Sequence, residues 1–127
     1  MTADVVAFAD RFMAALERAD AAEVVGFYTP DASIWHNFDD VAQSVTDNLK
    51  TLAWMARKFP SRRYRVVRRE LLSDGWLQQH VLELDSPETG PLRLHACCVI
   101  KIRDGLIERI EEYLDPAQVA VGKSARR

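Results

Sequence analysis

The sequence predicts an α+β fold: a cone-shaped α+β barrel in which three N-terminal helices pack on a curved, mostly antiparallel sheet around an internal cavity. Up to residue 59, apolar residues recur mainly with helical spacing, interrupted by one short strand pattern. From residue 62 to residue 114, four strand-like segments are joined by short turns or loops. Helices followed by a run of strands indicate α+β, and hairpin connections make neighbouring strands antiparallel.

Composition narrows the class of protein. The 127 residues fit one domain over residues 1–118, followed by a C-terminal tail over residues 119–127. A formal net charge of −2 argues against a nucleic-acid or anionic-membrane binder. No apolar run approaches the ~20 residues that span a bilayer, and acidic residues interrupt the N-terminus, so no signal peptide is expected. The only cysteines are neighbours, Cys97 and Cys98, which favours a reducing, cytoplasmic location.

The first two helices are predicted from an apolar stripe and a start signal. Residues 3–18 carry apolar side chains at i, i+3 and i+4 spacing: Val5, Phe8, Phe12, Ala15, Leu16 and Ala19. Asp20, with Glu23 three residues later, resembles a capping box and predicts a second, short helix. The sequence Thr29-Pro30-Asp31 is expected to end it, because proline cannot continue a helix.

Residues 31–38, DASIWHNF, predict a short strand that carries an imidazole toward the core. Side chains alternate between the faces of a strand, so Ala32, Ile34 and His36 share one face. The apolar pair assigns that face to the core. His36 therefore needs a partner or a function there.

Residues 40–59 predict a third helix, which Pro60 ends. Its apolar residues fall within a narrow arc: Val41, Val45, Leu49, Leu52, Ala56 and Phe59. Trp54 lies nearly opposite this arc, among polar residues. A large aromatic residue on a polar face favours an exposed contact residue.

Four strands are expected over residues 62–72, 76–85, 92–103 and 106–114. Arginines on both faces of the first of them favour a solvated sheet face. On the next three, the more apolar face includes Gln78 and His80, then Cys98, then Glu112. We therefore expect His36, Gln78, His80 and Glu112 to converge in an apolar cavity, where perturbed pKa values would suit proton transfer.

Other interpretations of these residues stay open. A histidine and a glutamate can form a buried structural pair without catalysis. Two histidines and a glutamate can also form a metal site, but they come from separate strands without a short ligand motif, so no metal is expected. Cys98, a cysteine on an apolar strand face, is expected to be an inert core residue rather than a nucleophile.

Three segments carry a family resemblance: DASIWHNFDD, VLELDSPETGPLRLHACCVIKI and RDGLIERIEEYLDP. Together they resemble the nuclear transport factor 2-like superfamily over residues 3–118, and more closely its SnoaL-like and ketosteroid-isomerase-like enzymes. The resemblance implies that His36 occupies the position of the isomerase base. Phe12 and Cys98 replace the two oxyanion-binding groups, so the isomerase oxyanion hole is missing. Glu112 matches the water-activating acid of limonene epoxide hydrolase.

Together, these observations predict an acid–base enzyme without cofactor that isomerises, cyclises, dehydrates or cleaves a small hydrophobic molecule, possible examples being aromatic or polyketide-like compounds. His36, His80 and Glu112 are the expected catalytic residues. The expected substrate-binding residues are Phe12, Tyr28, Trp35, Asn37, Leu52, Trp76, Gln78, Cys98 and Leu114. The alternatives are a non-catalytic ligand-binding or assembly module and an epoxide-hydrolase-like hydrolase. A homodimer is expected through the outer sheet face around His95, Cys97 and Val99.

Overall fold

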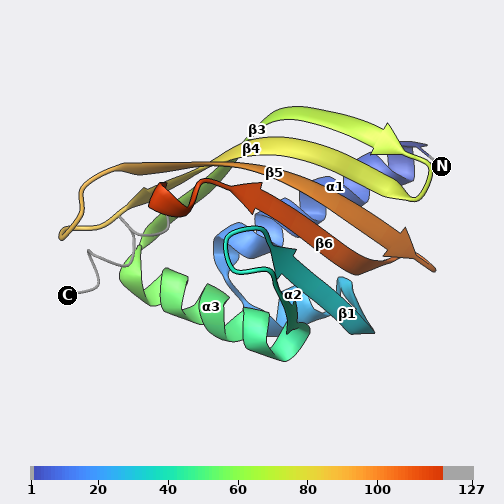
Figure 1. Cartoon of the computed structure of the whole chain (residues 1–127), viewed down its shortest axis with the longest axis horizontal. Helices are drawn as coiled ribbons and strands as arrows, with labels where there is room; N and C mark the ends of the chain where they lie inside the picture. Colours follow the sequence, from blue (N-terminus) through green and yellow to red (C-terminus); the bar gives the residue numbers. More distant parts are fainter. Residues whose placement is uncertain (1, 119–127) are drawn as a thin grey trace.

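The computed structural model describes residues 2–118, which form three helices and one six-stranded sheet (Figure 1). The expected C-terminal tail, residues 119–127, lies outside the described residues. In chain order the elements are α1 (Thr2–Arg18), α2 (Ala21–Val25), β1 (Tyr28–His36), β2 (Val41–Ser44), α3 (Val45–Lys58), β3 (Ser61–Leu72), β4 (Gly75–Asp85), β5 (Leu92–Arg103) and β6 (Leu106–Leu114).

The strands form an open, curved sheet in the order β2-β1-β6-β5-β4-β3. Every neighbouring pair is antiparallel except β1 and β6, which run parallel. The main core joins residues of all three helices to inward residues of the sheet, so the helices cover one face of it. The predicted α+β architecture is therefore confirmed. No helix among residues 2–118 has the length and apolar character needed to cross a bilayer.

Helix capping agrees with the sequence for α2 but not for α3. Asp20 Oδ1 accepts hydrogen bonds from the backbone N–H groups of Ala22, at 3.0 Å, and Glu23, at 3.3 Å. The predicted start of the third helix at residue 40 is wrong. Ser44 Oγ accepts from the Asp47 N–H at 3.1 Å, so α3 begins at Val45.

The four residues before α3 form β2, because a tight turn sends them back along β1. Asp40 adopts a left-handed conformation (φ 56°), and Asp39 Oδ1 accepts from the Val41 N–H at 3.1 Å. Val41 then pairs with His36 and is 50% exposed, although the helical arc predicted it to be buried. The apolar residues of this segment follow a helix only from Val45 onward.

The strand β1 also begins earlier than predicted, at Tyr28, so Thr29 and Pro30 lie within it. Its pairing with β6 is irregular between Tyr28 and Ser33. A proline fits such an interruption, where its missing N–H breaks no regular ladder.

A bulge between Val66 and Arg68 changes which side chains of β3 face inward. Tyr64 lies inside before the bulge, and Arg69 lies inside after it, although the two have opposite parity. Arg62 is also partly buried and donates to the Phe59 and Glu17 carbonyl oxygens, each at 2.8 Å. The prediction of a merely solvated arginine face is therefore wrong for Arg62 and Arg69.

Trp54 is also not the exposed contact residue that its position predicted. It is partly buried against a second apolar cluster formed by Phe59, Leu82 and Leu84. Its ring meets the Phe59 ring edge-on, with the centroids 6.3 Å apart. The sheet extends past the end of α3 and covers this side of the helix, so the helical arc alone underestimated the buried face.

The close approach of β4 to β5 at Gly75 gives a test of the fold. A Cβ atom on Gly75 would lie 1.8 Å from the Ile100 carbonyl oxygen, and neither backbone can move away without breaking the sheet. We expect Gly75→Ala to lower the free energy of unfolding by about 3 kcal/mol, at the upper end of overpacking costs. Urea unfolding measures this change.

Gly26→Ala is the matched control. Gly26 has helical backbone angles, φ −67° and ψ −12°, and its nearest contact would be the Glu23 carbonyl oxygen at 3.4 Å. This substitution should leave stability unchanged or raise it by roughly 0.4–1 kcal/mol. Equal unfolding midpoints for the two variants would contradict the strand register at Gly75.

Candidate functional site

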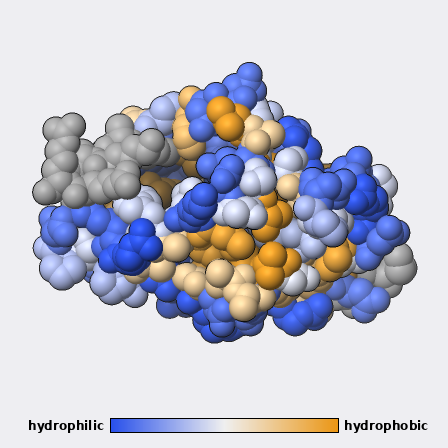
Figure 2. All heavy atoms as spheres, turned by 90° about the horizontal axis from the view of Figure 1, so that it is seen from below, coloured by the Kyte–Doolittle hydropathy of each residue, from blue (hydrophilic) through white to orange (hydrophobic). Residues whose placement is uncertain are grey.

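A cavity of about 510 Å³ lies between the helices and the inward face of the sheet. This volume is typical of small-molecule sites. Most of the wall is apolar; it includes Phe12, Leu16, Ile34, Leu52, Met55, Phe59, Leu82, Leu94, Ile100 and Ile110. Figure 2 shows hydrophobic residues gathered in the middle of the face seen from below Figure 1, with hydrophilic residues around them.

Five side chains form a continuous row across the sheet, which we call the polar row. His36 on β1 pairs with Glu112 on β6, and Glu112 pairs with Cys98 on β5. Cys98 pairs with Gln78 on β4, which pairs with Arg69 on β3. Directly paired residues of neighbouring strands lie on the same face, so one register brings together residues far apart in the sequence.

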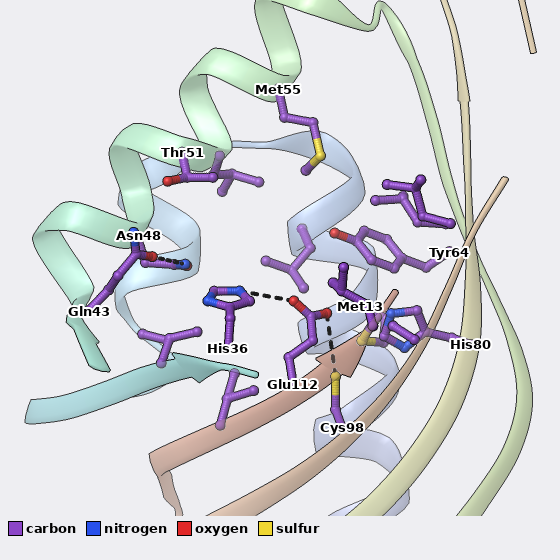
Figure 3. Close-up of a pocket in the computed structure, with 18 of the residues that line it drawn as sticks. Met13, His36, Gln43, Asn48, Thr51, Met55, Tyr64, His80, Cys98 and Glu112 are labelled. Carbon is purple, nitrogen blue, oxygen red and sulfur yellow. Dashed lines mark hydrogen bonds and ion pairs between the residues drawn. The ribbon is translucent and has the colours of Figure 1, made fainter. Parts of the chain in front are cut away.

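The first contact of the polar row is an ion pair. His36 Nε2 lies 3.0 Å from Glu112 Oε1, and the two side chains are only 13% and 22% exposed (Figure 3). Burial disfavours charge on His36, but its hydrogen bond and attraction to Glu112 raise its pKa above 6.5. Burial likewise opposes ionisation of Glu112, but the His36 hydrogen bond and the nearby His80 lower its pKa below 4.5. Each partner therefore extends the pH range over which the other is charged.

Cys98 contacts the second oxygen of the same carboxylate. Its Sγ lies 3.6 Å from Glu112 Oε2, and the thiol is the donor (Figure 3). Burial and the adjacent Glu112 carboxylate raise the pKa of the Cys98 thiol well above its usual range. A protonated, buried thiol is a weak nucleophile. The polar contact of the Cys98 thiol is with the Glu112 carboxylate.

His80 lies two residues beyond Gln78 on the same face of β4 and has a different environment from His36. It is 5% exposed, its Nδ1 lies 2.9 Å from Gln78 Nε2, and the Tyr64 ring meets it edge-on at 5.3 Å. Burial lowers the pKa of His80; Glu112 opposes this effect and Arg69 adds to it. The two cavity histidines are therefore shifted in opposite directions, His36 toward the imidazolium and His80 toward the neutral ring.

Within the described chain, His80, Cys98 and Glu112 form a group that could hold a metal ion. Each offers one ligand atom, and these atoms lie within 4.8 Å of one another. A divalent ion would require the Cys98 thiolate and a free nitrogen lone pair on His80. In this structure Cys98 Sγ donates to Glu112 Oε2 and His80 Nδ1 lies against Gln78 Nε2, so the thiol would have to give up its contact with the carboxylate before it could bind a metal ion.

Most of the expected substrate-binding residues line the cavity. They are Phe12, Tyr28, Leu52, Gln78, Cys98 and Leu114, together with the expected catalytic residues His36, His80 and Glu112. On β1, β4, β5 and β6, the side chains that alternation predicted to face inward therefore do face the cavity. Their roles in binding or catalysis are taken up below as a proposal.

Three expected substrate-binding residues are not on the wall. Trp35 lies on the other face of β1, where its Nε1 donates to Asp40 Oδ1 at 2.7 Å and its ring packs on Tyr113. Asn37 Oδ1 accepts from the Leu114 N–H at 2.9 Å and ties the end of β1 to β6. Trp76 is fully buried in the core against Phe8, so other side chains separate it from the cavity.

The structure adds wall residues that the sequence did not predict. Tyr64 comes from β3, where the half-buried Arg62 and Tyr64 alternate with the exposed Arg63 and Arg65; this alternation was a usable signal, but the arginines on both faces hid it. Asn48 donates to Gln43 Oε1 at 3.0 Å near His36 (Figure 3). Gln43 was obscured because β2 was predicted as part of a helix.

Comparison with solved structures places this fold among proteins with diverse names. PrhC from Penicillium brasilianum is 11% identical, the alignment covers 96% of this chain and 87% of that chain, and the TM-score is 0.86. IdmH from Streptomyces antibioticus, a proposed polyketide cyclase, is 16% identical, with coverage of 94% and 97% and a TM-score of 0.79. An epoxide hydrolase of M. tuberculosis similar to LEH is 16% identical, with coverage of 94% and 89% and a TM-score of 0.75.

At these identities the solved structures establish a common fold and not a common reaction. No curated protein sequence matches the chain significantly. The family model of the SnoaL-like domain, however, matches residues 9–110, which span most of the helices and strands and include His36 and His80; Glu112 lies two residues beyond the match. The chain therefore belongs to the SnoaL-like domain family.

Proposed function

We propose that the protein is an acid–base enzyme without cofactor that acts on a small apolar molecule held in the cavity. The observation that carries the proposal is the His36–Glu112 pair, 3.0 Å apart on the wall of a mostly apolar pocket. Coupled ionisable groups inside a ligand-sized cavity are typical of sites that move protons.

The two oxygens of Glu112 are held differently, which suggests how the pair works. Oε1 faces His36 at 3.0 Å, whereas the hydrogen bond that Oε2 receives within residues 2–118 comes from the weak thiol donor of Cys98 at 3.6 Å. Oε2 is therefore the better base. In the proposed step a substrate C–H bond breaks, the proton moves to Glu112, and the electron pair delocalises into an enolate. His36 keeps the carboxylate ionised and returns a proton to the substrate.

Isomerisation, cyclisation, dehydration and retro-aldol lysis all contain such a step, and the similarity of fold to IdmH, a proposed polyketide cyclase, supports this group of reactions. The epoxide hydrolase of similar fold supports an alternative in which Glu112 activates water. A third possibility is that the cavity only binds its ligand. The tests below separate these outcomes.

The first prediction concerns proton transfer. Enolisable aromatic ketones and β-ketoesters, incubated with the protein in D₂O, should exchange the hydrogen next to the carbonyl group faster than without protein. Because a positioned acid or base contributes ~10²–10⁴-fold, we expect His36→Ala and Glu112→Gln each to lower the exchange rate by that factor. Proton NMR measures the exchange.

Glu111→Gln is the matched control, since Glu111 is the preceding residue and pairs with Arg109 instead of facing the cavity. It should keep the wild-type rate. Full exchange activity in folded Glu112→Gln would show that Glu112 is structural. Binding of the ketone with no catalysed exchange would favour a binding module, and incorporation of ¹⁸O from labelled water into an epoxide would favour the hydrolase.

The second prediction concerns pH. In the wild type, NMR titration of His36 should give a pKa above 6.5, because the Glu112 contact outweighs burial. In Glu112→Gln the burial effect, which is the largest influence on His36, is opposed only by the smaller attraction of Asp39, so the His36 pKa should fall below 6.5. The imidazolium limb of the pH–rate profile should move to lower pH with it. An unchanged His36 pKa in this variant would contradict the ion pair.

The same pair makes stability depend on pH with a defined sign. His36 has a raised pKa, so its contribution is complete below pH 6.5 and is lost as the pH rises through its folded-state pKa. Glu112 has a lowered pKa, so its contribution is complete above pH 4.5 and is lost as the pH falls through its folded-state pKa. The stabilisation from the pair should therefore be greatest between these values and absent from Glu112→Gln.

The third prediction concerns assembly through the outer sheet face around His95, Cys97 and Val99. This face also exposes Val67 by 65% and Tyr113 by 49%, and no described helix covers it. We expect a homodimer, with a light-scattering mass of about twice 14.4 kDa, that Val67→Glu dissociates by placing charge in the apolar interface. A monomer at micromolar concentration would contradict this assignment.

A further inference from the structure

The side-chain amide of Gln78 has a forced orientation. Its Oε1 accepts three hydrogen bonds: from Arg69 Nε at 3.1 Å, from Arg69 Nη2 at 2.9 Å and from Trp76 Nε1 at 3.3 Å. All three partners are obligate donors. The atom that meets them must therefore be the oxygen, because the reversed amide would set an NH₂ group against three N–H groups.

Burial and an ion pair hold the Gln78 amide in this orientation. Gln78 and Trp76 are fully buried, and Arg69 is only 14% exposed along its side chain. Arg69 Nη1 also donates to Asp10 Oδ1 on α1 at 2.7 Å, so the helix anchors the guanidinium. The amide has no free space to rotate.

The orientation of Gln78 decides the tautomer of His80. Gln78 Nε2 must be a donor, and it lies 2.9 Å from His80 Nδ1, with Met13 Sδ as its other, weak partner at 3.4 Å. His80 Nδ1 must therefore accept, which leaves the ring proton on Nε2. A second proton on Nδ1 would set two donors against each other, so this contact also opposes the imidazolium.

We propose that Gln78 holds His80 as a neutral imidazole whose Nε2–H binds a substrate oxygen, and that the substrate is therefore a small apolar carbonyl compound. The substrate class depends on the proposed function, because Glu112 must generate the negative charge that His80 receives. Gln78 and Arg69 are positioning residues in this proposal. His80 is the catalytic donor for the developing enolate oxygen.

The spacing and the surroundings of His80 suit this role. One ring nitrogen of His80, the Cys98 sulfur and one Glu112 carboxylate oxygen lie within 4.8 Å of one another, so a carbonyl group and its neighbouring carbon are large enough to reach from the His80 ring to the base. The ionisable groups around His80 are Glu112, Cys98, Tyr64 and Arg69. Burial raises the pKa values of Tyr64 and Cys98, so neither supplies a competing negative charge near neutral pH.

The test is a long-range ¹H–¹⁵N NMR experiment on the intact wild-type protein, which contains three histidines. At pH 7, His80 should show a protonated Nε2 and an unprotonated Nδ1. A proton on Nδ1, or an imidazolium at pH 7, would overturn the proposal. This result does not depend on catalysis, so it can succeed or fail independently of the proposed proton transfer.

Gln78→Glu tests the role of the amide with nearly the same shape. A carboxylate accepts from Nδ1–H, so His80 should take up a proton at Nδ1 and its pKa should rise above 6.5. Gln79→Glu is the matched control, because Gln79 is exposed on the opposite face of β4 and should leave His80 unchanged. If Gln78→Glu does not fold, the wild-type tautomer still decides the proposal. An unchanged His80 in a folded Gln78→Glu variant would overturn it.

Two additions to the wild-type sample test what His80 recognises. 4-Nitrophenolate, used as an oxyanion probe, should move the Hε2 resonance of His80 downfield as it binds. Failure to bind at millimolar concentration, or binding without this shift, would overturn the assignment of an oxygen site. Zinc chloride should leave both nitrogen resonances of His80 in place, because no free lone pair faces the metal, and zinc coordination by His80 would contradict the tautomer.

Discussion

The parallel register of β1 against β6 is the constraint on which the site depends. It pairs His36 with Glu112 and so places an imidazole against a carboxylate on the inward face of the sheet. Either group alone would be costly to bury as an ion, but together they keep opposite charges in an apolar cavity. A shift of one residue would send His36 to the outer face and leave Glu112 without its partner.

The residues of the polar row favour different protonation states in the two cavity histidines, His36 and His80. At one end, contact with Glu112 favours the charged form of His36. Toward the other end, Arg69 and Gln78 favour the neutral form of His80, although the same carboxylate is nearby. Environments that separate the pKa values of two like groups let one transfer protons while the other donates a hydrogen bond. Cys98, between them, donates a hydrogen bond to the carboxylate and otherwise packs in the apolar core.

Two irregularities in the sheet complete the cavity. The bulge after Val66 lets Tyr64 and Arg69 both face inward, so the same strand supplies a wall residue and an anchor for Gln78. The short strand β2 turns back along β1 and brings Gln43 to the wall near His36, where Asn48 of α3 binds it. Bulges and tight turns commonly re-aim side chains beside functional sites in this way.

The sequence by itself determined the fold class, the four long strands and the inward direction of His36, Gln78, His80, Cys98 and Glu112, because side-chain alternation and apolar periodicity are local properties. The same alternation puts Trp35 and Asn37 on the parity opposite to His36, so the expectation that they bind substrate went against the strand pattern. The sequence did not determine that Trp76 lies away from the wall or that Arg69 lies inside. Those two placements follow from the packing of Trp76 against Phe8 of α1 and from the bulge in β3. The 3.0 Å contact of His36 with Glu112 likewise needed the tertiary structure, because the register of two strands some seventy residues apart is decided only when the sheet assembles.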